Sequence, residues 1–243
     1  MEKYWPLAVA PVLICLCYMY IRDKYEKEPY RLLAVGLVFG AAITAPIVHV
    51  ETLVMSWMPA LDVQGEALYV SFLVASLVEE GFKLLVLCLL MWRERNFNER
   101  FDGIVYAVFI SLGFACVENV LYVVNPSLGG LGTALSRAVY SVPAHGFFGV
   151  AMGYYIALWR FVPTGRVWHA LGAFFVPWAL HGAFDFILLA ELPHFMFLFV
   201  PFVILLWWGG LRKMRRHLAL SPFRNADKQG EESDREKFID VKG

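Results

Sequence analysis

Two adjacent glutamates, Glu79 and Glu80, stand in the middle of a long apolar run, in the segment V-E-E-G-F-K. A charge at the centre of a membrane helix costs at least about 2.5 kcal/mol, so each carboxylate there needs a partner. Lys83 follows by one helical turn, and we expect it to neutralise one of the two glutamates. The other then requires a proton, a metal or a second partner. The pair therefore predicts a functional site rather than one ion pair that fixes helix packing.

Three later apolar runs carry further ionisable or amide side chains. The segment G-F-A-C-V-E-N holds Glu118 and Asn119, the segment P-A-H-G-F-F-G holds His145, and A-L-H-G-A-F-D-F holds His181 and Asp185. Residues four apart lie on one face of a helix, so His181 and Asp185 are neighbours. This spacing suits either an aspartate that orients a histidine or two ligands of one metal ion.

Several of these side chains also have a purely structural explanation. Glu118 can form an ion pair with Arg137 near the end of its helix, and Asp102 can cap the start of that helix. His49 and Glu51 lie closer to the surface than the other candidates, and we interpret them as rim residues without a catalytic role. A lone histidine in an apolar helix is usually a packing residue. The other ionisable side chains in the neighbouring apolar runs favour a functional role for His145.

Composition places all of these side chains in lipid. Of the 243 residues, 59% are hydrophobic and 17% charged, which is too apolar for one soluble domain of this length. The formal net charge is zero and no zinc-finger or basic-domain pattern occurs, so we expect no nucleic-acid partner. A bilayer core about 30 Å thick needs roughly 20 apolar residues of helix, which predicts an all-α transmembrane bundle of about seven spans. The expected spans are residues 4–21, 32–57, 67–92, 103–124, 139–159, 167–190 and 195–211.

The basic residues predict how the bundle is oriented. Lys and Arg occur after the first, third, fifth and seventh spans, whereas residues 59–66, 125–136 and 191–194 contain neither. Because short basic connections stay in the cytoplasm, we expect the N-terminus outside and the C-terminus inside. Residues 1–220 then form the transmembrane domain, with a catalytic core at about residues 67–190. The polar residues 221–243 are expected to be a disordered cytoplasmic tail.

Counting along the helices brings the ionisable groups to similar depths, in or beyond the middle of the membrane on its outer side. There the chemistry fits hydrolysis: one glutamate takes a proton from water, while His145 and His181 stabilise the oxyanion. The alternative is a divalent metal such as zinc, which lowers the pKa of its bound water. The residues that could hold such a metal are Glu79, Glu80, His145, His181 and Asp185. No H-E-x-x-H or G-x-S-x-G motif supports other hydrolytic routes.

The joint pattern of E-E-x-x-K, then F-D-G-x-x-Y with G-F-A-x-x-E-N, then His145, then H-x-x-x-D resembles the PrsW family of bacterial membrane proteases. That family is related to the CAAX prenyl endopeptidases and to the bacteriocin-processing membrane proteases. The resemblance implies that the catalytic residues are Glu79, Glu80, His145, His181 and Asp185. We expect Lys83, Glu118 and Asn119 to support them.

The chain departs from the related endopeptidases at two positions. Ser141 stands where they usually have an aromatic residue, and Asp185 stands where they often have Asn, which can donate to an oxyanion. Orientation of His181 or metal binding is therefore the role we expect for Asp185.

The resemblance also implies a cellular role. It predicts a multi-pass protein of the bacterial cytoplasmic membrane that makes the first cut in a single-span anti-sigma factor on the outer side, in a stress response. Two other functions fit buried charges in a membrane bundle: a non-catalytic scaffold subunit, and a proton- or ion-coupled carrier whose glutamates form a relay.

Overall fold

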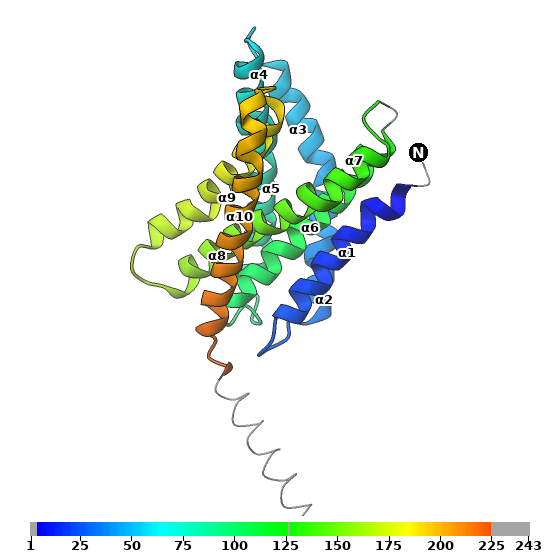
Figure 1. Cartoon of the computed structure of the whole chain (residues 1–243). Coiled ribbons are helices and arrows are strands. Elements are labelled where there is room, and N and C mark those ends of the chain that lie inside the picture. The colour runs from blue at the N-terminus through cyan, green and yellow to red at the C-terminus, as the bar shows by residue number, and fades with distance from the viewer. Residues whose placement is uncertain (1–3, 126, 225–243) are drawn as a thin grey trace, which may run out of the picture.

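The described part of the chain, residues 4–125 and 127–224 of a computed structural model, is helical and contains no strand (Figure 1). This confirms the all-α prediction. Two of the helical segments, η2 and η3, are π-helical. In chain order the segments are α1 (Trp5–Arg22), α2 (Tyr30–Ala42), α3 (Thr44–Ser56), α4 (Val63–Tyr69), η2 (Val70–Ser76), α5 (Leu77–Met91), α6 (Arg100–Val124), α7 (Leu131–Ser136), η3 (Arg137–Ser141), α8 (Val142–Phe161), α9 (Arg166–Leu189) and α10 (Pro193–Ala219).

Helix α6 is the centre of the bundle and packs against α1, α2, α5 and α8. Every side chain from Phe101 to Ala115 is buried, as expected for a helix that is apolar on all sides and enclosed by others. The helix begins at Arg100, three residues before the expected start of that span. The N-cap is Glu99 rather than Asp102; Asp102 lies at the N3 position of a capping box, where its Oδ2 accepts a hydrogen bond from the backbone N–H of Glu99 at 2.7 Å.

Helices α6 and α8 approach closely because glycines line the contact. A Cβ atom added at Gly153 would lie 2.2 Å from the carbonyl oxygen of Gly103, and one at Gly149 would lie 3.0 Å from that of Ala107. Small residues four apart allow two membrane helices to bring their backbones together. This contact holds the helix that carries His145 against the helix that carries Glu118.

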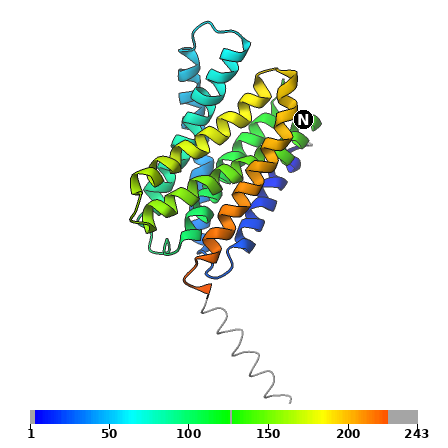
Figure 2. The ribbon, with the colours of Figure 1, turned by 60° about the vertical axis from the view of Figure 1, so that its left-hand side comes forward.

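Two long helices contain a π-helical segment immediately before a predicted site residue. Helices α4 and α5 are joined through η2, which ends three residues before Glu79, and α7 and α8 are joined through η3, which ends four residues before His145 (Figure 2). A π-helical turn holds an extra residue and so changes the direction of the side chains that follow. The sequence interpretation treated both helices as regular.

Within the described residues, five helices are long and apolar enough to cross a membrane: Trp5–Arg22, Tyr30–Ser56, Arg100–Val124, Arg166–Leu189 and Phe197–Ala219. The other two expected spans, 67–92 and 139–159, are not among them. The first is divided by η2, and polar residues lower the hydropathy of the second. Both carry groups of the predicted site.

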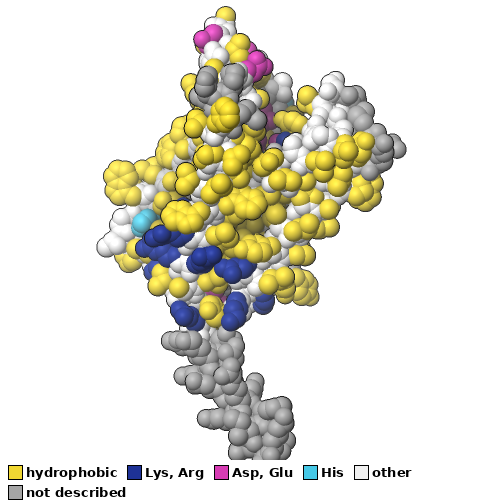
Figure 3. Space-filling view, in the orientation of Figure 1, with side chains coloured by type: hydrophobic (Ala, Val, Ile, Leu, Met, Phe, Trp, Pro, Cys, Tyr) yellow, Lys and Arg dark blue, Asp and Glu magenta, His cyan; other side chains and the backbone are white. Residues whose placement is uncertain are grey.

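The surface in Figure 3 is broadly apolar, and its Lys and Arg side chains gather at the end where α10 finishes. Asp and Glu side chains appear at the opposite end, near α4. Such an apolar belt between polar ends is typical of a protein that lies in a bilayer. Of the expected tail 221–243, residues 225–243 lie outside the described residues, and Ser221 is buried.

Candidate active site

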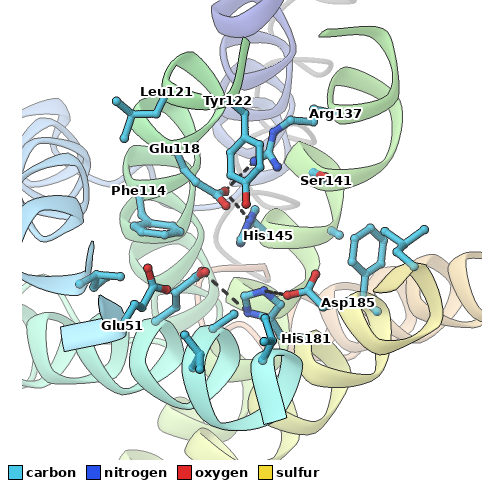
Figure 4. A pocket seen from close by; sticks show the side chains of 18 of the residues that line it. Glu51, Phe114, Glu118, Leu121, Tyr122, Arg137, Ser141, His145, His181 and Asp185 are labelled. Atoms are coloured by element: carbon cyan, nitrogen blue, oxygen red, sulfur yellow. Dashed lines mark hydrogen bonds and ion pairs between the residues drawn. The ribbon is translucent and has the colours of Figure 1, made fainter. Parts of the chain in front are cut away.

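A cavity of about 620 Å³ lies between α3, α5, α6, α8 and α9, and its walls include both π-helical segments (Figure 4). Four of the predicted catalytic residues line it: Glu79, His145, His181 and Asp185. Glu80 does not line the cavity; it is fully buried behind Glu79. The predicted catalytic groups therefore do meet, although they come from three separate helices.

Lys83 joins the two glutamates to the first histidine. Its Nζ donates to Glu79 Oε2 at 3.0 Å and to Glu80 Oε1 at 2.8 Å, and it lies 3.3 Å from His145 Nδ1. Lys83 thus contacts both glutamates, although its single positive charge balances only one of them, as expected. Glu79 and Glu80 precede Lys83 by four and three residues, and each of these distances is about one helical turn. The long side chain of Lys83 can therefore contact both carboxylates.

His181 lies between two carboxylates. Its Nδ1 is 3.0 Å from Glu80 Oε1 and its Nε2 is 3.3 Å from Asp185 Oδ2. The ring also stacks on Phe148, with centroids 4.8 Å apart. Both the orientation and the position of this imidazole are thus fixed by its neighbours, and Asp185 contacts the cluster through His181, as a residue that orients a histidine would.

Glu118 holds His145 from the other side. Its Oε2 accepts a hydrogen bond from Arg137 at 2.7 Å and lies 3.0 Å from His145 Nε2. The ion pair weighed as the structural explanation for Glu118 is therefore present, and so is the contact with the site. Asn119 does not line the cavity: its Oδ1 accepts from Arg137 Nε at 2.8 Å, and its Nδ2 donates to the Ala8 carbonyl at 2.7 Å.

Glu51, interpreted from the sequence as a rim residue, lies in the wall of the cavity. It lines the cavity together with Glu79 and Glu118, and Figure 4 shows it beside the other labelled side chains. It has no hydrogen bond or ion pair with any other described residue. Its position in an apolar helix was the available signal. His49, treated in the same way, is exposed and does not line the cavity.

The donor atoms of four residues, Glu79, Glu80, His145 and His181, lie within 4.8 Å of one another, and all four side chains are buried. Two carboxylates and two imidazoles are ligands that zinc and similar divalent metals accept. Glu80 Oε2 is buried without a hydrogen-bond partner. The donor set and this free oxygen both fit a metal ion at the cluster.

A cavity inside a membrane helix bundle, lined by carboxylates and imidazoles that can activate water, defines a membrane-embedded hydrolase. The profile described as "PrsW family intramembrane metalloprotease" matches residues 28–208. The chain belongs to the PrsW family of intramembrane metalloproteases, and is thus a membrane-embedded peptidase and a multi-pass bacterial membrane protein.

Curated relatives agree with this assignment. The chain is 38% identical to Protease PrsW of Clostridioides difficile over 87% of this chain and 90% of the relative. It is 35% identical to Protease PrsW of Bacillus subtilis, covering 86% and 92%, and 34% identical to that of Geobacillus kaustophilus, covering 86% and 89%. No solved structure matches the chain.

Proposed function

We propose that this protein hydrolyses a peptide bond in a single-span, membrane-anchored protein, as the first cut in an anti-sigma factor. The observation that carries the catalytic part is the convergence of Glu79, Glu80, His145 and His181 beside one cavity. The names of the relatives support the protease activity. The anti-sigma factor as substrate rests on the family resemblance of the motifs alone.

In the proposed mechanism, Glu79 is the general base. Its Oε2 is held by Lys83, whereas its Oε1 accepts no hydrogen bond from the described residues and belongs to a side chain that lines the cavity. That oxygen can take a proton from water and return it to the leaving amine. Glu80 is a positioning residue, because it fixes Lys83 and His181 and does not reach the cavity.

The two histidines flank the position where the scissile carbonyl would bind. His145 and His181 line the cavity, with ring centroids 5.2 Å apart, and an N–H that turns from its carboxylate partner toward the carbonyl oxygen can stabilise the negative charge that develops there. If a divalent metal such as zinc is bound by Glu79, Glu80, His145 and His181, it supplies Lewis-acid polarisation and a more acidic water. With or without a metal, Glu118 orients the imidazole of His145 and Asp185 orients that of His181.

We further propose seven spans, with the N-terminus outside and the C-terminus in the cytoplasm. The basic end of the molecule in Figure 3 supports a cytoplasmic position for the end of α10. Leu128 and Thr133, from the connection that has no Lys or Arg, line the cavity, which supports an opening toward the outer side. The substrate would then be cut close to the outer membrane surface.

The test is cleavage of candidate single-span proteins by the purified chain in lipid vesicles. Wild type is compared with Glu79→Gln, and Glu66→Gln serves as the control, because Glu66 is exposed on α4 and makes no contact with the cavity. We expect products from wild type and from Glu66→Gln, and none from Glu79→Gln. Loss of product on addition of a chelator assigns the activity to a bound metal.

Other outcomes separate the remaining functions. If well-folded wild type cleaves no candidate, the proposed substrate is wrong. If Glu79→Gln cleaves as fast as wild type, the proposed base is wrong. Proton or ion flux across the same sealed vesicles, without peptide products, would identify a carrier.

A further inference from the structure

The centre of the catalytic cluster is filled by a side chain of the protein itself. Lys83 Nζ lies within 3.3 Å of three acceptor atoms, Glu79 Oε2, Glu80 Oε1 and His145 Nδ1, and the residue is fully buried. An ammonium group has three N–H donors and no acceptor, so these three contacts use all of its hydrogens. The same three residues belong to the group that could hold a metal.

The hydrogen bonds of His145 agree with this arrangement. Its Nδ1 faces the ammonium of Lys83 and must accept, so its Nε2 carries the proton and donates to Glu118 Oε2 at 3.0 Å. The nitrogen that points to the cluster centre is then the one with the free lone pair. A metal ion would require this same lone pair.

The three contacts of Nζ have the lengths of hydrogen bonds, and a metal in its place would need the same atoms to move closer. Contacts of 2.8, 3.0 and 3.3 Å are hydrogen-bond lengths. Zinc bonds to nitrogen and oxygen are about 2.0–2.2 Å long. The cluster is therefore spaced to surround Nζ, and a metal bound at its centre would meet a positive charge already in place.

We propose that Lys83 is the internal cation of the metal-free cluster, and that a divalent metal and the Lys83 ammonium compete for the same three atoms. The ammonium keeps two buried glutamates together before a metal arrives, and it must leave its position for the metal to bind. The ring of Phe114, whose centroid is 4.3 Å from Nζ, gives the displaced ammonium a second partner on the cavity side. Lys83 thus sets how tightly this peptidase holds its metal. This inference rests on the proposed catalytic role of the cluster.

The test measures metal affinity rather than proteolysis. Zinc is titrated into the full-length protein in detergent, in competition with a chromophoric chelator, for wild type, Lys83→Met and Lys83→Arg. A variant with both Glu79→Gln and His145→Ala gives the background from exposed groups. We expect Lys83→Met to bind zinc at least tenfold more tightly than wild type, and Lys83→Arg, which keeps the positive charge, to bind no more tightly than wild type.

Equal or weaker zinc binding by Lys83→Met than by wild type overturns the inference, as does zinc binding by Lys83→Met no tighter than by the background variant. If Lys83→Met does not fold, Lys83→Gln takes its place with the same expected gain. Failure of both to fold even with zinc present would also refute the inference, because the metal could then not replace the ammonium. Cleavage by wild type in excess chelator would leave the proposed peptidase intact while removing the role of the metal.

Discussion

The contact between Arg137 and Glu118 gives the most direct test of how the site is held together. Arg137 donates to Glu118 at 2.7 Å, and the same carboxylate oxygen lies 3.0 Å from His145. Replacing Arg137 with Met keeps an unbranched side chain of similar length and removes the charge. Glu118 would then remain as a carboxylate in the cavity wall with His145 as its only partner.

The magnitude follows from how deeply the pair is buried. Breaking a fully buried pair costs about 3–5 kcal/mol, whereas an exposed pair contributes about 0–1 kcal/mol. The side chains of Arg137 and Glu118 are 12% and 18% exposed, so the cost should lie closer to that of a buried pair than to that of an exposed one. We expect Arg137→Met to lower the free energy of unfolding by about 2–3 kcal/mol. Asn119 contributes to this cost because it loses the Arg137 Nε donor.

The assay is reversible unfolding in mixed micelles for Arg137→Met, Glu118→Gln and the double variant. Removing both charges leaves no unpaired carboxylate, so the double variant should be more stable than the sum of the two changes predicts, by at least about 1 kcal/mol. Arg93→Met is the control, because Arg93 is exposed and should change stability by less than about 0.5 kcal/mol. Additive effects would refute the assignment of Glu118 as a carboxylate that depends on Arg137.

Two further predictions concern the scaffold. Gly153→Ala should destabilise the fold by about 3 kcal/mol in the same unfolding assay, because its Cβ would lie 2.2 Å from the carbonyl oxygen of Gly103, whereas Gly146→Ala, with no such contact closer than 3.8 Å, should be neutral or slightly stabilising. Burial raises the pKa of Glu28, in the α1–α2 connection, to about 7, so the folded state holds a proton there that the unfolded state releases near its usual pKa of 4.5. Stability should therefore be highest at low pH and fall as pH rises through this window, by on the order of 1 kcal/mol. Glu28→Gln, which can still accept from Tyr106, should reduce that fall in thermal unfolding measured between pH 5 and pH 8, while the part from Asp23, whose pKa burial raises to about 6, remains; an unchanged pH dependence would contradict the burial argument.

The sequence predicted where the helices lie because lipid burial leaves a hydropathy signal about 20 residues long. It did not predict the interruption between α2 and α3 at Ile43, within the expected span 32–57. The cause is Pro46, which has no N–H to donate to the carbonyl of Ala42, the residue at which α2 ends.

The residues of the site could largely be predicted from the sequence, but the contacts between their side chains could not. Buried charges are rare in membrane helices, so each one marks a position that needs an explanation, and four of those marked meet at the cluster. The atoms that come into contact depend on side-chain rotamers and on helix packing. The spacing of residues along the sequence specifies neither. The second contact of Lys83 was missed for this reason, because one turn of separation allows one partner or two.

The π-helical segments connect the local sequence to the geometry of the site. A π-helical turn has a wider backbone than an α-helical turn, and in η2 the carbonyl of Phe72 accepts a hydrogen bond from the indole Nε1 of Trp178 at 2.8 Å. Trp178 precedes His181 by three residues on α9, so this bond fixes that helix directly against the segment that leads to the glutamates. The 3.0 Å separation of His181 Nδ1 and Glu80 Oε1 therefore depends on a register that neither helix specifies alone. Because η2 itself contains no proline or glycine that would disturb a regular turn, we assign its π-helical geometry to packing against α9.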